Sequence, residues 1–252
     1  MKAFVLVCMA IGTALAAPIC AQPVDPPPLA WETPRPLVAF SGTYAAHYRG
    51  KPAGDATLSL RQLADGMWEA RLDVRGNRGV IGVLGLNLVQ TTRFERLPDG
   101  QFRPQTQQTV RKGLFVGKSV TGRYDWNQQL AHWSGDIDRK RRQPVPLQPG
   151  DLSALLINLA VVRDASPGVV LRYRFADAGR SREYHYKAAE RPAPVTVQDL
   201  SYEALHLWRT NSREGDATEF WIAPGIPTPI RILQQEDGRP GIDLQLVQYE
   251  GG

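Results

Sequence analysis

Hydrophobic and polar residues alternate along much of the chain after Phe40. The alternation is clearest in the segments Thr57–Arg61, Trp68–Val74 and Ile242–Val247. Successive side chains of a β-strand point to opposite faces, so a period of two predicts strands with one buried and one solvated face. An amphipathic helix would instead repeat its apolar positions about every 3.6 residues.

Asp-Gly pairs separate several of these alternating runs, at residues 65–66, 99–100 and 237–238. Asp-Gly favours the positive φ angles that tight hairpin turns require. A meander of many strands has to curl or close, because open twisted sheets rarely exceed about ten strands. We therefore predict a mainly β fold: one large curled or spiral antiparallel sheet or open barrel, forming a single β domain over 39–250. The strand candidates are 40–49, 55–64, 67–75, 86–96, 101–111, 119–126, 129–137, 169–175, 181–188, 195–210, 217–223, 228–236 and 241–249.

The segment 151–163 departs from the strand pattern and predicts one buried helix. It begins at Asp151, a favourable N-cap, and stops before the Ser-Pro-Gly sequence at 166–168. It is apolar on nearly every side, which is typical of a buried helix. At ~1.5 Å per residue it would be about 20 Å long. Such a helix either fills the curled sheet as a core element or gates a cavity inside it.

A second unusual segment, 76–88, has glycine at every third position among aliphatic residues. The spacing matches neither a dinucleotide-binding loop nor a phosphate-binding loop. It indicates either a bent or bulged strand, in which glycine permits sharp curvature, or a mobile apolar lip beside a lipid-sized pocket. Strand tryptophans either fill the core or line such a pocket. The pocket-lining candidates are Gly79, Ile81, Gly82, Leu84, Leu155, Leu159 and Trp221.

The first residues have the pattern of an export signal. Met1-Lys2 precedes an uncharged apolar run, 4–17, which is short for a bilayer span. We expect a signal peptide at 1–21 and a proline-rich linker at 22–38, so that no transmembrane segment remains after cleavage. Cleavage after Ala16, a lipoprotein and an uncleaved anchor are the alternatives. Cleavage after residue 21 also removes both cysteines of the chain.

The formal net charge of +5 is concentrated in one run, Arg139–Arg142. Nucleic acid is not an expected partner of an exported protein. The run would attract anionic lipid or a cell-wall polymer. Alternatively it is a solvated turn, which Asp136 and Asp138 neutralise in part.

No group of residues in the sequence indicates catalysis. The nearest approach to a G-x-S-x-G nucleophile motif, Gly117–Gly122, has one residue too many. The four histidines lie far apart and do not form the H-E-x-x-H pattern of zinc enzymes. We therefore expect a non-enzymatic protein with no catalytic residue, no metal site and no cofactor.

Four local features follow one another in a distinctive order. They are the strand and turn at 40–54, the segment 151–156, the late strands at 219–232, and the closing hairpin at 237–246. In this order they resemble the exported bacterial family catalogued as domain of unknown function 3108, over about 40–249. The resemblance implies a periplasmic protein of the Gram-negative envelope. It also implies a curled sheet similar to that of lipoprotein carrier and receptor proteins, and it brings no agreed catalytic residues.

Three functions are consistent with these features. The first is a periplasmic protein of cell-envelope maintenance whose concave sheet binds a lipid-like or peptide ligand, a lipoprotein or an envelope protein. The second is a structural or scaffold protein that acts through its outer surface, including the run 139–142. The third is a cell-wall hydrolase, which requires distant acids or histidines to converge in the fold.

Overall fold

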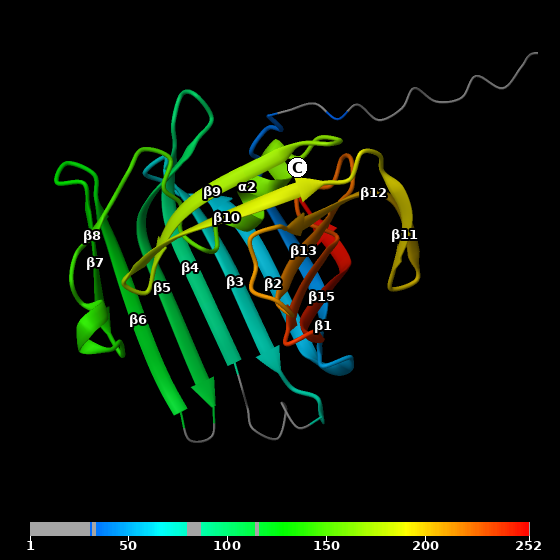
Figure 1. Ribbon diagram of the computed structural model, residues 1–252, viewed down its shortest axis with the longest axis horizontal. Helices are drawn as coiled ribbons and strands as arrows, with labels where there is room; N and C mark the ends of the chain where they lie inside the picture. Colours follow the sequence, from blue (N-terminus) through cyan, green and yellow to red (C-terminus); the bar gives the residue numbers. More distant parts are fainter. Residues whose placement is uncertain (1–30, 32–33, 80–86, 114–115, 252) are drawn as a thin grey trace, which may run out of the picture.

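The structure is a computed structural model that describes residue 31 and residues 34–79, 87–113 and 116–251. Strands dominate it (Figure 1). The strands are β1 (Phe40–Tyr48), β2 (Lys51–Gln62), β3 (Trp68–Gly76), β4 (Asn87–Arg96), β5 (Phe102–Gly113), β6 (Val116–Asp125), β7 (Leu130–Gly135), β8 (Val145–Pro146), β9 (Val170–Asp177), β10 (Arg180–Ala188), β11 (Ala193–Val197), β12 (Leu200–Arg209), β13 (Ala217–Ile222), β14 (Arg231–Glu236) and β15 (Arg239–Glu250). The helices whose bounds lie within the described residues are α2 (Ile157–Asp164) and the short 3₁₀-helix η1 (Arg139–Arg141).

The described strands form one large antiparallel sheet. The order across it is β8-β7-β6-β5-β4-β3-β2-β1-β15-β14-β13-β12-β10-β9, and β11 pairs with β12 beside this path. Neighbours in sequence are mostly neighbours in space, and the pairing of β1 with β15 joins the two ends of the chain. Figure 1 shows the sheet curling around α2, with β9 and β10 crossing in front of the helix. The predicted mainly β fold with a curled antiparallel sheet and a helix inside is confirmed.

The two ends of the sheet approach each other through a few isolated contacts to β9 rather than through a full ladder. Leu152 forms an isolated parallel bridge with Phe175 of β9. On the other side, the Tyr124 hydroxyl of β6 donates a hydrogen bond to the Ala176 carbonyl at 2.7 Å. These contacts bring β6 and β9 together and make the sheet a nearly closed barrel.

The inward faces of the strands and the helix form the main core. Burial alternates along β1 and β2, as the period of two predicts. Tyr44 of β1 is fully buried, and its hydroxyl lies 2.5 Å from the Thr228 hydroxyl and donates to the Pro229 carbonyl at 2.8 Å. Burial raises the pKa of Tyr44 well above its usual value. This phenol therefore ties the first strand to the segment before β14 while its polar atom stays satisfied.

The helix is shorter than its sequence pattern predicts. Residues 151–156 form a bridge and a turn, and only the second half of the predicted segment is helical. Asp151 does not cap the helix, because its carboxylate accepts the Gln148 N–H at 2.8 Å and pairs with Arg174. The N-cap is Leu156, which makes no side-chain cap hydrogen bond. The expectation of a buried helix is confirmed, since most of its side chains are buried.

The predicted hairpin turns are present. Asp237 and Gly238 have φ angles of 50° and 71° between β14 and β15, which suits a tight primed turn. The carboxylates of Asp65 and Asp99 accept backbone N–H groups two residues on, at 3.1 and 2.9 Å. Such Asx turns explain why aspartate precedes glycine at these positions.

The basic run 139–142 forms the exposed 3₁₀-helix η1 and its C-cap. Arg141 lies 3.8 Å from Asp138, and Arg142 donates to the Gly135 carbonyl at 3.3 Å. The structure therefore places this run on a solvated turn in which an aspartate neutralises part of the charge.

Glu69 lies on the outer face of β3 between two arginines. Its carboxylate is 2.7 Å from Arg61 and 3.3 Å from Arg93. Burial alone would raise the pKa of this carboxyl, but the hydrogen bonds and charges of the two arginines outweigh burial. The net effect lowers the pKa of Glu69 below its usual value.

The variant Glu69→Gln is expected to lose a pH-dependent part of the stability. The pKa of Glu69 is lower in the folded state than in the unfolded state, where it is about 4.3. The ionised carboxylate therefore stabilises the fold fully above the unfolded-state pKa. This stabilisation is lost as the pH falls through the folded-state pKa. At pH 7 we expect the free energy of unfolding to fall by about 1 kcal/mol. Urea unfolding of both proteins at pH 7 and in acid measures the difference. An equal difference at both pH values would contradict an ionic origin.

Candidate functional site

The interior of the barrel is filled at one end and open at the other. Helix α2 fills the end that is uppermost in Figure 1, where Leu156, Ala160 and Val161 are fully buried. A layer of polar side chains lies beside the turn before the helix. There the hydroxyls of Thr92 and Ser153 are 2.9 Å apart. Beyond this layer, the inward faces of β1 to β5 continue toward the second end of the barrel.

A cavity of about 410 Å³ lies at this second end, and we call it the lower cavity. Its size is within the range of about 300–1,000 Å³ that is typical of small-molecule sites. Its wall is mostly apolar, and Val74 and Leu88 face each other across β3 and β4. The described lining residues are Ala46, His47, Tyr48, Ala53, Val74, Arg75, Gly76, Asn87, Leu88, Arg111, Lys112 and Ile242.

The charged residues in the described lining of the lower cavity are basic, and of these Arg111 projects from the inward face of its strand. Arg75, Arg111 and Lys112 are in the lining, and none of the described lining residues is an aspartate or a glutamate. Arg75 has a partner, since its Nε is 3.4 Å from Asp73. Arg111 and Lys112 form no ion pair within the described part of the chain. The lining therefore carries positive charge beside a large apolar wall, and it offers no carboxylate for acid–base chemistry.

Close backbone packing shapes the rim of the lower cavity. A Cβ at Gly54 would lie 1.9 Å from the carbonyl oxygen of Arg75, so only glycine allows β2 to approach β3 at this point. Just beyond, the N–H groups of Asn77 and Arg78 both donate to the Ala53 carbonyl at 3.1 Å. These contacts fix the end of β3, from which Val74 and Gly76 line the cavity.

A smaller polar cavity of about 260 Å³ adjoins the lower cavity, and Arg111 lines both. Arg111 pairs across the ladder with Lys118 of β6, so both side chains project from the concave face. Three acids, Asp136, Asp138 and Asp177, also line the polar cavity. Each of these acids has another partner. Asp136 accepts the Ser119 N–H at 2.7 Å, and Asp138 lies 3.8 Å from Arg141. Asp177 accepts a hydrogen bond from the Gln107 amide.

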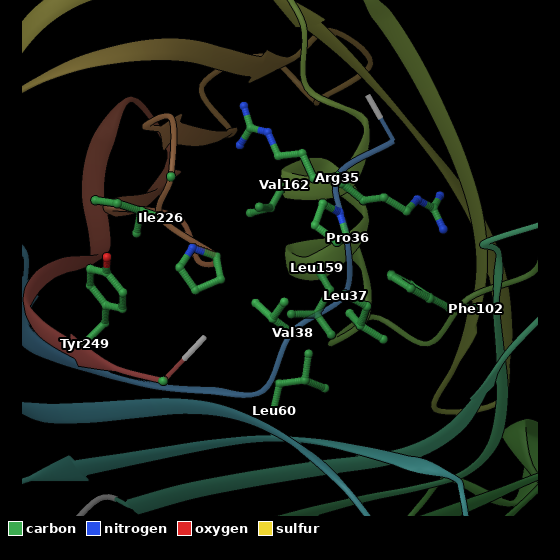
Figure 2. A pocket seen from close by; sticks show the side chains of 14 residues that line it. Arg35, Pro36, Leu37, Val38, Leu60, Phe102, Leu159, Val162, Ile226 and Tyr249 are labelled. Atoms are coloured by element: carbon green, nitrogen blue, oxygen red, sulfur yellow. The ribbon is translucent and has the colours of Figure 1, made fainter. Parts of the chain in front are cut away.

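A third hollow, the upper pocket, lies at the helix end and measures about 310 Å³ (Figure 2). Residues 35–38 run along it, opposite Ile226 and Tyr249, while Leu159 and Val162 of α2 lie behind. The Arg35 N–H donates to the Arg163 carbonyl at 3.0 Å, which fastens this segment to the end of the helix. The upper pocket is thus a gap between the chain that enters the domain and the packed core.

The structure distributes the pocket candidates from the sequence over different places. Gly79 is exposed near the rim of the lower cavity, and a Cβ added there would lie 3.6 Å from the Pro52 carbonyl oxygen. Leu155 is buried in the core, and Leu159 lines the upper pocket. Trp221 lies on the outer face of β13. The remaining candidates, Ile81, Gly82 and Leu84, lie outside the described residues.

Trp221 belongs to an outer cluster rather than to either cavity. Its ring stacks on His206 with centroids 4.5 Å apart, and the Arg231 guanidinium lies 4.9 Å from its centre. Its neighbour Phe220 instead points inward and is buried. The alternation of the strand thus sends one aromatic ring to the core and the next to the surface.

Sequence reasoning missed the residues that line the lower cavity, above all Arg111. The inward phase of β5 begins at Phe102 and Pro104, and a regular strand would continue it to Val110. A bulge at 105 shifts the phase, so Gln107, Thr109 and Arg111 face inward instead. The weak signal in the sequence was the loss of alternation between 104 and 107.

Two features are absent from the residues that the structure describes. No group of three or more histidines, cysteines, aspartates or glutamates is placed so that it could hold a metal ion. Within the same residues, every helix is too short or too polar to cross a bilayer.

Comparisons with known proteins identify a family. No curated protein matches the chain. One solved structure, the beta-barrel-like protein of domain of unknown function DUF1849 from Brucella abortus, is similar with a TM-score of 0.48 and 10% identity, over 86% of this chain and 98% of that chain. The family model described as "Protein of unknown function (DUF3108)" matches residues 43–239, which is most of the chain. The chain therefore belongs to the DUF3108 family.

Proposed function

We propose that this is a non-enzymatic binding protein that takes a lipid-like ligand into the lower cavity. One observation carries the proposal: a barrel that a helix fills at one end keeps an apolar cavity of about 410 Å³ at the other. Folded domains normally pack their interiors densely, so an apolar space of this size invites an apolar ligand.

The residues around the cavity favour binding over catalysis. The described lining offers one histidine, His47, and no carboxylate that would serve it as a partner. The ion pairs that include a histidine, His185–Glu183 and His206–Glu219, belong to exposed or outward-facing positions away from the cavity. The described lining of the lower cavity thus lacks the paired groups of a hydrolase.

We further propose that the protein works in the periplasm and serves cell-envelope maintenance. The export pattern at residues 1–21 motivates this location. A full-length chain with a C-terminal epitope should then be released by osmotic shock, with Gln22 as its mature N-terminus. Recovery with the cytoplasmic fraction would overturn the location without touching the ligand proposal.

A fluorescent probe tests the ligand proposal. N-phenyl-1-naphthylamine is uncharged, and its emission rises when it enters an apolar site. We expect saturable binding of about one molecule per protein chain. Native mass spectrometry of protein purified from cells should also show a mass adduct that organic extraction removes. Absence of both saturable binding and adduct would overturn the proposal.

A further inference from the structure

We propose that Arg111 and Lys118 form a head-group site that selects a single-chain anionic amphiphile. Its apolar chain would lie in the lower cavity, and its carboxylate or phosphate would bind between the two cations. The inference rests on the proposed function, because it assigns the charge of a ligand whose apolar part that function accommodates. It adds a chemical class that the cavity alone does not specify.

The position of Arg111 carries the first step. Its side chain lines both the apolar lower cavity and the adjoining polar cavity. A ligand with its chain in the first would therefore place its polar end against Arg111 as it enters the second. The register of β5 and β6 sets Lys118 directly opposite Arg111 on the same concave face. Cross-strand partners have Cβ atoms about 4.5–5.5 Å apart, close enough for two cations to share one anionic group.

The electrostatics carry the second step. Like charges directly opposite each other in a ladder destabilise a sheet, and a bound anion relieves that repulsion. In the described part of the chain, neither Arg111 nor Lys118 forms an ion pair. The connecting segments 80–86 and 114–115 contain no charged residue in the sequence. The two cations at this end of the barrel are therefore available to a ligand.

The guanidinium group favours the oxygen anions named. Its planar donors match carboxylate and phosphate oxygens in a two-pronged arrangement, and lysine adds a compact positive charge. Lys112 and Arg75 also border the lower cavity, but both lie on the outward phase of their strands, so Arg111 and Lys118 supply the positive charge of the concave face. A cationic amphiphile would meet the repulsion of Arg111 and Lys118 at the same place. The aspartates of the polar cavity, Asp136, Asp138 and Asp177, already have other partners and offset this repulsion only in part.

A set of twelve-carbon amphiphiles tests the inference by displacement of N-phenyl-1-naphthylamine. Dodecanoate and dodecyl phosphate carry an anionic head, 1-dodecanol a neutral one and dodecylammonium a cationic one. We expect at least one of the two anions to bind about tenfold more tightly than the alcohol. The cation should bind most weakly of the four. Added salt should reduce the advantage of the anions and leave the alcohol unchanged. The stronger of the two anions identifies the head group.

The variant Arg111→Gln/Lys118→Gln should remove the advantage of the anions while the uncharged probe and 1-dodecanol still bind. The control variant Arg123→Gln/Lys140→Gln removes two exposed cations outside the cavities and should keep the advantage. If the wild type binds all four amphiphiles equally, or if the first variant keeps the preference, the inference is wrong and the ligand proposal stands. If no amphiphile displaces the probe because the probe itself does not bind, the proposed function fails first.

Discussion

The variant Phe220→Ala is expected to lose about 3–5 kcal/mol of its free energy of unfolding. Phe220 is 2% exposed and lies in β13 between Leu207 and Ile232 on the neighbouring strands. Its ring meets the edge of Tyr186 at a centroid distance of 5.5 Å. Removing the ring leaves a cavity in the filled half of the barrel, where the surroundings relax only partly. For a domain of this size, the melting temperature should fall by about 6–20 °C, measured by circular dichroism.

The adjacent variant Trp221→Ala is the matched control. It deletes a larger ring one residue further along, but on the outer face, where the ring stacks on His206. We expect a loss of about 1–2 kcal/mol and unchanged binding of the fluorescent probe. A loss at Trp221 equal to that at Phe220 would mean that the outer cluster carries as much of the stability as the core. If a folded Trp221→Ala protein no longer binds the probe, Trp221 is part of the ligand site, as the sequence predicted.

The architecture was predictable because it depends on patterns that are local in sequence. Alternation marks each strand, and Asp-Gly pairs mark turns between consecutive strands. A meander needs little more, since most strands pair with the next one along the chain. The pairing of β1 with β15 joins strands from the two ends of the chain in the middle of the sheet, and no local signal in the sequence marks it.

The predicted N-cap and start of the helix were wrong because they depend on contacts between residues that are distant in sequence. Asp151 has the residue type and position of an N-cap, yet its carboxylate instead pairs with the half-buried Arg174 and accepts the Gln148 N–H. The turn 151–156 then gains its own hydrogen bonds from β9, where the Leu152 N–H donates to the Arg174 carbonyl at 3.0 Å. Local propensity for a helix is weak and such tertiary contacts override it.

The candidate site could not be located from sequence for a related reason. A single extra residue in β5 reverses which side chains face inward, and the only signal of it in the residue types is the weak loss of alternation between 104 and 107. The sequence instead predicted a pocket lined by apolar residues of the helical and glycine-rich segments. Of these, Leu155 belongs to the packed end of the barrel. An arginine on an inward phase is the more informative feature, because Arg111 stays exposed there and so marks a part of the concave face that the packed core does not fill.

The variant Leu88→Trp is expected to abolish binding of N-phenyl-1-naphthylamine, with at least a tenfold loss of affinity. Leu88 is half-buried, lines the lower cavity and faces Val74 across the ladder. An indole at this position would project into the open space and occupy the volume that the ligand needs. Because the cavity is not packed, the larger side chain should cost little stability, unlike an insertion into a dense core. Fluorescence titration and thermal unfolding measure the two quantities.

The neighbouring variant Val89→Trp separates blockage of the cavity from a general disturbance of β4. Val89 is also half-buried, but it lies on the outer face of the same strand, opposite Asp73 and Val110. It should bind the probe like the wild type. Equal loss of binding in both variants would show that the site depends on the strand rather than on the lower cavity. Retained binding in a stable Leu88→Trp protein would move the ligand to the upper pocket, where Leu159→Trp would then be the variant that blocks it.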